Sequence, residues 1–206
     1  RRNYQGIKQR RAYCDGVFFR RPGQVTYVEN SADQLILVDS QDQQTGTLSK
    51  VECHVGTGTL HRAFSAFLFN ENGELLLQQR SHNKPLWPLI WANSCCSHPR
   101  AGEDTLDAAH RRVREELGIE TELNYLFKFE YQAQYDETGA EHELCWVFVG
   151  HFTGKPKVDS SEVADWRFVK PSELNAAIDA EPGIYSPWLK LEWARITRDF
   201  LDQIPS

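Results

Sequence analysis

The residues best suited to chemistry are concentrated between Trp91 and Glu103, where two thiols, an imidazole and a carboxylate occur within thirteen residues. Cys96 lies two positions before His98, and Pro99 biases the backbone of that histidine toward an extended conformation. A cysteine and a histidine this close could be a nucleophile with its base, half of a zinc site, or neighbours with separate tasks. Because the stretch also contains small residues, a proline and a glycine, we predict a shaped loop rather than a strand or helix.

Four further side chains could join His98 at a metal ion. His54 and His61 flank a Gly-Thr-Gly-Thr run that disfavours a helix, so a loop folding back on itself could bring both rings to one point. Glu141 and Glu143 project from the same face of a predicted strand, where like charges repel unless something positive lies between them. Each histidine alone is more often a surface or core residue. Together, three imidazoles and two carboxylates suit a divalent ion such as Mn²⁺, Mg²⁺ or Zn²⁺.

A second charged set could bind a diphosphate. Carboxylates of the helix predicted over residues 105–117, Glu116 among them, could hold Mg²⁺ against such a group. The cations that could clamp the same diphosphate are Lys50, Arg80, Lys84 and Arg112. Each of them alone is more often an ordinary surface residue.

The hydrophobic pattern predicts the elements that must position these groups. Strands are expected at residues 35–39, 47–50, 62–69, 74–80, 125–135, 141–149 and 166–169. The 105–117 helix should bury Leu106, Ala109, Val113 and Leu117, and Gly118 should end it. A short helix should begin at Pro171, and a last helix at Ser186-Pro187 should bury Leu189, Trp193, Ile196 and Phe200. This order indicates an α+β or α/β/α layered domain.

Composition and charge restrict the possible partners. The chain has 206 residues and a net charge of −6, divided into +5 for residues 1–30 and −11 for residues 31–206. So acidic a body is a poor nucleic-acid binder, and no apolar run approaches the roughly 20 residues of a membrane span. The five scattered cysteines favour free thiols in a reducing, cytoplasmic environment. We expect residues 1–30 to be a weakly ordered basic extension.

Residues 97–119 resemble a degraded Nudix box, whose pattern is Gly, five residues, Glu, seven residues, Arg-Glu-apolar-any-Glu-Glu-any-Gly-apolar. Glu103, Arg111 and the segment 115–119 match it, whereas Ser97 replaces the leading Gly and Arg112 replaces the Glu after Arg. With the cation Arg112 in place of a metal-binding carboxylate, the site would favour binding a diphosphate over hydrolysing it.

Residues 34–205 are similar to type 1 isopentenyl-diphosphate Δ-isomerases. The matching stretches are His54 and His61, the segments 93–99 and 141–145, and Tyr185-Ser186-Pro187-Trp188. The resemblance implies a Nudix-like α/β/α domain over residues 31–206, with a mixed sheet and a long C-terminal helix. It also implies isomerisation of isopentenyl diphosphate to dimethylallyl diphosphate by a 1,3-proton shift in isoprenoid biosynthesis.

The same resemblance implies a role for each matching residue. The ligands of a divalent metal would be His54, His61, His98, Glu141 and Glu143. Cys96 and Glu143 would be the acid/base pair, with Tyr131 hydrogen-bonded near Glu143 and Trp188 facing the cationic centre. Glu116 would help to hold an Mg²⁺ ion that arrives with the substrate diphosphate. The residues that would meet that diphosphate are Lys50, Arg80, Lys84 and Arg112.

Two other functions remain open from the sequence. A Nudix hydrolase would release phosphate or a nucleoside monophosphate, and a metal-bearing binding domain would turn over nothing. For the isomerase we expect a small allylic or homoallylic diphosphate as substrate, no nucleic acid, no membrane span, and a monomer or weak homodimer.

Overall fold

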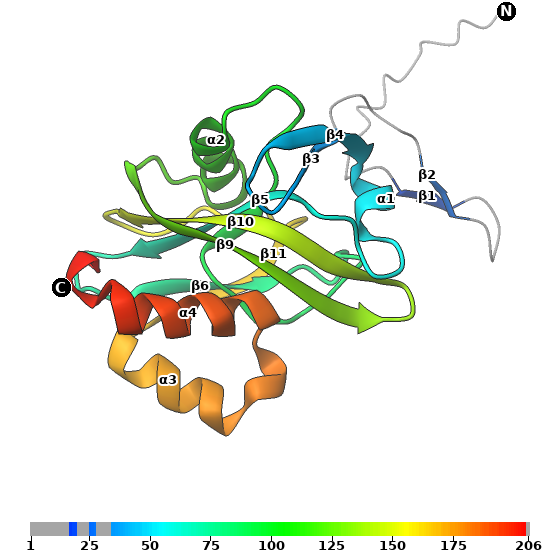
Figure 1. Ribbon diagram of the computed structural model, residues 1–206. Coiled ribbons are helices and arrows are strands. Elements are labelled where there is room, and N and C mark those ends of the chain that lie inside the picture. The colour runs from blue at the N-terminus through cyan, green and yellow to red at the C-terminus, as the bar shows by residue number, and fades with distance from the viewer. Residues whose placement is uncertain (1–16, 20–24, 28–33, 205–206) are drawn as a thin grey trace, which may run out of the picture. The chain divides into compact units, whose positions relative to one another are not determined.

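The computed structural model describes residues 17–19, 25–27 and 34–204 (Figure 1). The chain divides into two units after Ser31, and each is described by itself. In the first unit, β1 (Val17–Phe19) and β2 (Val25–Tyr27) pair antiparallel. No strand was expected there, and most of the predicted basic extension lies outside the described residues.

The second unit is built on one nine-stranded sheet, in which the order of the five central strands is β11-β6-β5-β10-β9. The strands are β3 (Gln34–Val38), β4 (Gln44–Ser49), β5 (His61–Phe69), β6 (Leu75–Arg80), β7 (Trp91–Ala92), β8 (Cys95–Ser97), β9 (Leu123–Asp136), β10 (Gly139–His151) and β11 (Val163–Val169). Because β5 and β10 run parallel while the other described pairs are antiparallel, the sheet is mixed, as predicted.

Helices cover both faces of this sheet. They are α1 (Lys50–His54), α2 (Thr105–Leu117), α3 (Pro171–Ala180) and α4 (Pro187–Asp199), with short 3₁₀ turns η2 (Pro182–Ile184) and η3 (Leu201–Gln203). Ala66 and Leu68 of β5 pack with α2, whereas Phe67 between them packs with α4, since successive side chains of a strand point to opposite faces. Figure 1 shows α4 below the sheet and α2 above it. The predicted α/β/α layering is therefore confirmed. Among the described residues, no helix is both long and apolar enough to cross a bilayer.

The central helix α2 has the predicted bounds. Asp104 accepts hydrogen bonds from the first-turn amides, and Gly118 ends the helix with a left-handed backbone at φ +63°. The predicted stripe was wrong at Leu106, which is 36% exposed. The helix is rotated so that Thr105 and Ala108 reach the core instead.

Two other local predictions were wrong. Trp91 to Glu103 is not entirely a loop, because β7 pairs with β6 and β8 pairs with β5. Such short strands owe their hydrogen bonds to partners distant in the chain, so local pattern could not reveal them. Lys50, predicted to continue a strand, instead begins α1, and the Ser49 hydroxyl accepts from the Glu52 amide at 3.3 Å to cap that helix.

Candidate metal and proton-transfer site

Three imidazoles and two carboxylates meet at one point of the sheet. The possible donor atoms of His54, His61, His98, Glu141 and Glu143 all lie within 4.8 Å of one another. His54 Nε2 is 2.8 Å from a Glu141 oxygen, and His98 Nε2 is 2.9 Å from Glu143 Oε1. The structure thus brings together all five residues that the sequence proposed as metal ligands.

The sheet register and one close backbone approach produce this convergence. The parallel pairing of β5 with β10 sets His61 opposite Glu143, and His98 follows directly after β8 on the other side of β5. His54 ends α1 and reaches the site because Gly139 has no side chain. A Cβ at Gly139 would collide with the His54 carbonyl oxygen. The loop between the two histidines turns through Gly58, whose φ of +78° favours glycine.

The donor set fits a divalent cation. The Nδ1 atoms of His54 and His61 are 2.5 and 2.7 Å from the carbonyl oxygens of Lys50 and Thr59, which directs both Nε2 atoms toward the cluster. Among the described residues, His61 Nε2 is buried and has no hydrogen-bond partner. A buried polar atom without a partner is unusual, and a metal ion would satisfy it. Mixed imidazole and carboxylate ligation suits several divalent metals.

Burial places two of the three imidazoles, those of His61 and His98, in the form that binds metal. It lowers the pKa of His61 to about 4 and that of His98 below its ordinary value. Both rings are therefore neutral at pH 7, with a lone pair available. Burial acts to raise the pKa of Glu141, but the neighbouring His54 outweighs it and holds that pKa at about 2. Burial and then the Glu141 charge raise the pKa of Glu143 well above its usual range, a shift that a bound cation would oppose.

Tyr131 and Cys96 lie beside Glu143 on the same face of the sheet. Tyr131 is opposite Glu143 in the β9–β10 register, and its hydroxyl donates to Glu143 Oε2 at 2.8 Å. Cys96 is opposite Ser65 of β5, which shares its face with His61 because the two are an even number of residues apart. Burial raises the pKa of the Cys96 thiol to about 12, so this thiol carries its proton at neutral pH.

An apolar cluster lies around the thiol and the phenol, and we call it the apolar cluster. Its buried members are Ala63, Leu86, Trp87, Ala92, Tyr131, Cys145 and Trp188, with Cys96 packed against them. Trp188 is 3% exposed, and its indole N–H donates to Asn93 Oδ1 at 3.1 Å. Asn93 also donates to the Cys95 carbonyl at 2.9 Å, so one amide side chain ties the indole to the strand that carries Cys96.

The predicted diphosphate cations are distributed over three places. Lys84 and Arg112 both pair with Glu162, the second at 3.0 Å, and Arg112 also lies 2.5 Å from Glu116 Oε1. Arg80 donates to the carbonyls of Leu86 and Trp87, and its guanidinium lies 5.3 Å from the centre of the Trp188 ring. Arg80 thus also supports the apolar cluster.

Lys50 lies next to the histidines of the His/Glu cluster. Burial, then the charges of His61 and His54, and then that of Lys50 lower the pKa of His98. Lys50 also contributes the carbonyl to which His54 Nδ1 is joined.

Sequence reasoning missed two buried carboxyl groups, Glu162 and Glu192. Glu162 neutralises Lys84 and Arg112, and its place in a loop gave no local pattern to detect. Glu192 was detectable, because it lies four residues after Trp188 and next to Trp193, on the side of α4 that faces the sheet. Glu103, identified through the Nudix box, instead pairs with Arg111 at 2.7 Å near the start of α2.

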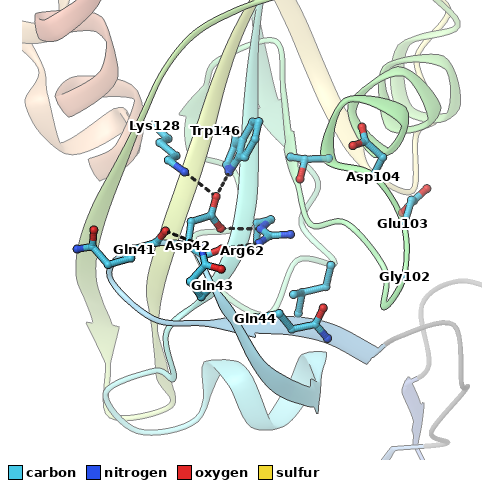
Figure 2. Close-up of a pocket in the computed structure, with 12 residues that line it drawn as sticks. Gln41, Asp42, Gln43, Gln44, Arg62, Gly102, Glu103, Asp104, Lys128 and Trp146 are labelled. Atoms are coloured by element: carbon cyan, nitrogen blue, oxygen red, sulfur yellow. Dashed lines mark hydrogen bonds and ion pairs between the residues drawn. The ribbon is translucent and has the colours of Figure 1, made fainter.

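A separate hollow of about 540 Å³ shares no residue with the His/Glu cluster (Figure 2). Its central carboxylate, Asp42, has its backbone at φ +64° and lies 7% exposed. Asp42 pairs with Arg62 at 2.7 Å and Lys128 at 2.9 Å, and it accepts a hydrogen bond from the Trp146 indole at 2.9 Å. These contacts join the β3–β4 turn to the sheet, so we interpret this group as structural.

Comparison with known proteins assigns the family. The NUDIX domain model matches residues 59–190. "Isopentenyl-diphosphate Delta-isomerase 1" of Photorhabdus laumondii is 39% identical over 174 residues, covering 84% of this chain and 99% of that protein. The chain belongs to the isopentenyl-diphosphate Delta-isomerase family. Another member, from Nocardia farcinica, is 44% identical over 154 residues, covering 74% of this chain and 88% of its own length.

Solved structures confirm the fold. DR0079 from Deinococcus radiodurans matches with a TM-score of 0.66 at 22% identity, over 80% of this chain and 99% of its own. A MutT protein from Methanosarcina mazei matches with a TM-score of 0.58 at 18% identity, over 68% and 94% of the two chains. At these identities the likeness concerns the Nudix fold alone, whereas the isomerase family rests on the closer sequence relatives.

Proposed function

We propose that the chain catalyses the reaction for which its relatives are named, converting isopentenyl diphosphate to dimethylallyl diphosphate by a 1,3-proton shift. The observation that carries the proposal is the placement of Cys96 and Glu143. The strand register sets both on one face of the sheet, beside the same apolar cluster. A proton donor and a proton acceptor next to apolar side chains are what an alkene isomerisation needs.

The reaction adds one proton to the carbon skeleton of the substrate and removes another proton from it. The terminal CH₂ carbon of the alkene takes a proton, which leaves a tertiary cationic centre, and loss of a proton two carbons away forms the new double bond. Cys96 holds a proton at neutral pH, and Glu143 can accept one. The two groups exchange these roles in the reverse direction, so the geometry is consistent with either assignment.

The apolar cluster must exclude water from the bound substrate, because water would capture the cationic centre. The Trp188 ring offers negative electrostatic density without a nucleophile, an attraction of about 2 kcal/mol or more when desolvated. That amounts to roughly a 30-fold rate effect or more, so the indole cannot account for catalysis alone. Its hydrogen bond to Asn93 fixes the ring, and the edge of Trp87 packs against it at 5.4 Å between centroids.

His54, His61, His98, Glu141 and Glu143 would hold a divalent metal, with Mn²⁺, Mg²⁺ and Zn²⁺ as the candidates. Such an ion would favour the ionised form of Glu143. Tyr131 would hold the other oxygen of that carboxylate in place. Glu116 would meet the Mg²⁺ ion that accompanies the substrate.

We further propose that Lys84 and Arg112 bind the substrate diphosphate, with Lys50 and Arg80 completing the cationic set. Glu162, the present partner of Lys84 and Arg112, offers one carboxylate oxygen to each of these two cations, as a phosphate group would. An Arg112→Glu variant should therefore bind isopentenyl diphosphate more weakly than the parent does, in calorimetric titration with Mg²⁺. If the variant bound isopentenyl diphosphate as tightly as the parent, Arg112 would not be a diphosphate-binding residue.

One experiment tests the function as a whole. The protein is incubated with isopentenyl diphosphate and Mg²⁺ in D₂O, and the carbon skeleton and phosphorus species are followed by NMR. Deuterium entering the skeleton with the diphosphate intact is the expected result. Release of phosphate would point to a Nudix hydrolase, and an unchanged substrate to a binding domain, so either result would overturn the proposal.

Two further expectations belong with this function. The enzyme should act in the cytoplasm, where its thiols stay reduced. It should be a monomer or a weak homodimer, which sedimentation at several concentrations would test.

A further inference from the structure

Glu192 is a buried carboxyl group that the proposed reaction does not use. It lies on α4 with 0% exposure, and among the described residues its Oε2 atom has no hydrogen-bond partner. Carboxylic acids are rarely buried completely unless a cation pairs with them. The partners found for Glu192 are instead two neutral groups, the Cys145 thiol and the Ser65 hydroxyl.

Those two partners connect Glu192 to the strands that carry the proton-transfer residues. The Cys145 thiol donates to Glu192 Oε1 at 3.4 Å and lies 3.6 Å from the Ser65 hydroxyl. Ser65 is the β5 residue opposite Cys96, and Cys145 follows Glu143 by two positions on β10, on the same face. The carboxyl group therefore lies on the same face of the sheet as the acid/base pair, on the side of α4.

This position favours a neutral carboxylic acid. Burial raises the pKa of Glu192 to about 8, although the hydrogen bonds from Ser65 and Cys145 act in the opposite direction. An ionised carboxylate in this apolar surrounding, without a cation beside it, would be strongly destabilised. A negative charge here would also act on the reacting groups, because Glu192 is among the charges that raise the pKa of Cys96, Glu143 and Tyr131.

We propose that Glu192 is a positioning residue of the isomerase, whose proton-bearing carboxyl group holds Ser65 and Cys145 in place beside the acid/base pair and whose ionisation slows the reaction. The inference rests on the proposed function. When Glu192 loses its proton, the added negative charge strengthens the hold of Cys96 on its own proton. Ser65 is hydrogen-bonded to Glu192 and lies opposite Cys96, so the added charge acts on the Cys96 thiol.

The other groups that face this region titrate outside the relevant range. Burial holds the pKa values of Cys96, Cys145 and Tyr131 far above neutral, so these groups keep their protons. Arg80 contributes a positive charge that acts on the Cys96 thiol. A metal at the His/Glu cluster would keep Glu143 ionised. Among these groups Glu192 is thus the one expected to titrate near pH 8.

The pH profile of kcat, measured on the metal-loaded enzyme, tests the effect on the reaction. For the parent, kcat should fall above about pH 8, by up to about tenfold per pH unit, whereas E192Q should lack that fall. E192L, which removes the polar contacts, should lower kcat at pH 7 with little change in KM, and E192Q should keep it. Glu181→Gln, an exposed control, should keep the parent profile. The same alkaline fall in E192Q, or equal kcat values for E192L and E192Q, would overturn the proposal.

Infrared spectroscopy gives a readout that does not need activity. The parent should show a protonated carboxylic C=O band at pH 7 that disappears near pH 8 and is missing in E192Q. Absence of that band from the parent at pH 7 would refute the neutral acid even if E192Q failed to fold. If the band behaves as expected but no isomerisation is detected, the proposed function fails and the protonation state of Glu192 stands.

Discussion

Replacing Tyr131 by phenylalanine removes one buried hydroxyl and little else. The hydroxyl donates to Glu143 Oε2 at 2.8 Å, while the ring stacks on Phe129 with centroids 5.5 Å apart. Phenylalanine keeps that stacking. The variant therefore isolates the hydrogen bond that orients the proposed base.

A hydrogen bond to a charged group contributes about 1.5–3 kcal/mol. If Tyr131 holds the Glu143 carboxylate mainly in the geometry of the transition state, its loss should lower kcat by about 10- to 150-fold, since 1.36 kcal/mol corresponds to tenfold. KM for isopentenyl diphosphate should change little, because Tyr131 contacts the base and not the diphosphate cations.

The assay is steady-state kinetics of dimethylallyl diphosphate formation, with the metal content and melting temperature of each variant measured alongside. Tyr125→Phe is the matched control, because Tyr125 lies on the same strand but is 48% exposed. Its kcat should stay within about twofold of the parent. A Tyr131→Phe enzyme that keeps its metal and loses less than twofold in kcat would refute the role of this hydrogen bond.

Three further predictions concern the thiol, the metal ligands and the buried ion pairs. Cys96→Ala should abolish measurable isomerisation while Cys95→Ala keeps it, because the adjacent Cys95 side chain packs on the α2 face; steady-state assays of both variants check this, and comparable rates would exclude the thiol. His61→Ala should weaken Mn²⁺ or Zn²⁺ binding at least about tenfold relative to the exposed control His151→Ala, measured by calorimetry on metal-stripped protein; equal affinities would place the metal elsewhere. For Glu162, burial opposes ionisation but Lys84 and Arg112 lower the pKa from 4.5 to about 2, so its stabilisation is present above pH 4.5 and is lost as the pH falls toward 2. This loss is about 3 kcal/mol of unfolding free energy, and urea titrations of Glu162→Gln should show a correspondingly shallower acid dependence than the parent; equal slopes would contradict it.

Local sequence pattern determined the elements that carry strong periodicity. Thr105 to Leu117 could be predicted as a helix to the residue, because an Asp cap, an apolar stripe and a glycine stop all act within the segment. The alternation from Glu141 to Val149 placed Glu141 and Glu143 on one face of a strand for the same reason. The pattern could not fix the rotation of the helix about its axis, and so Leu106 was assigned to the core.

Only the tertiary structure decided which groups meet. His54, His61 and His98 are joined through the parallel register of β5 with β10, the pairing of β8, and the space left by Gly139, which are contacts between distant segments. Residue types and spacing suggested these residues as metal ligands but left other roles open, and the resemblance to a known family assigned them the ligand role.

The buried carboxyl groups show the same limit. Whether Glu162 faces cations and Glu192 faces neutral partners depends on elements far away in the chain, and so do their opposite pKa shifts. Sequence fixes the ionisable group at each position, whereas burial and the charge of neighbouring side chains set its protonation state, and both are properties of the folded chain.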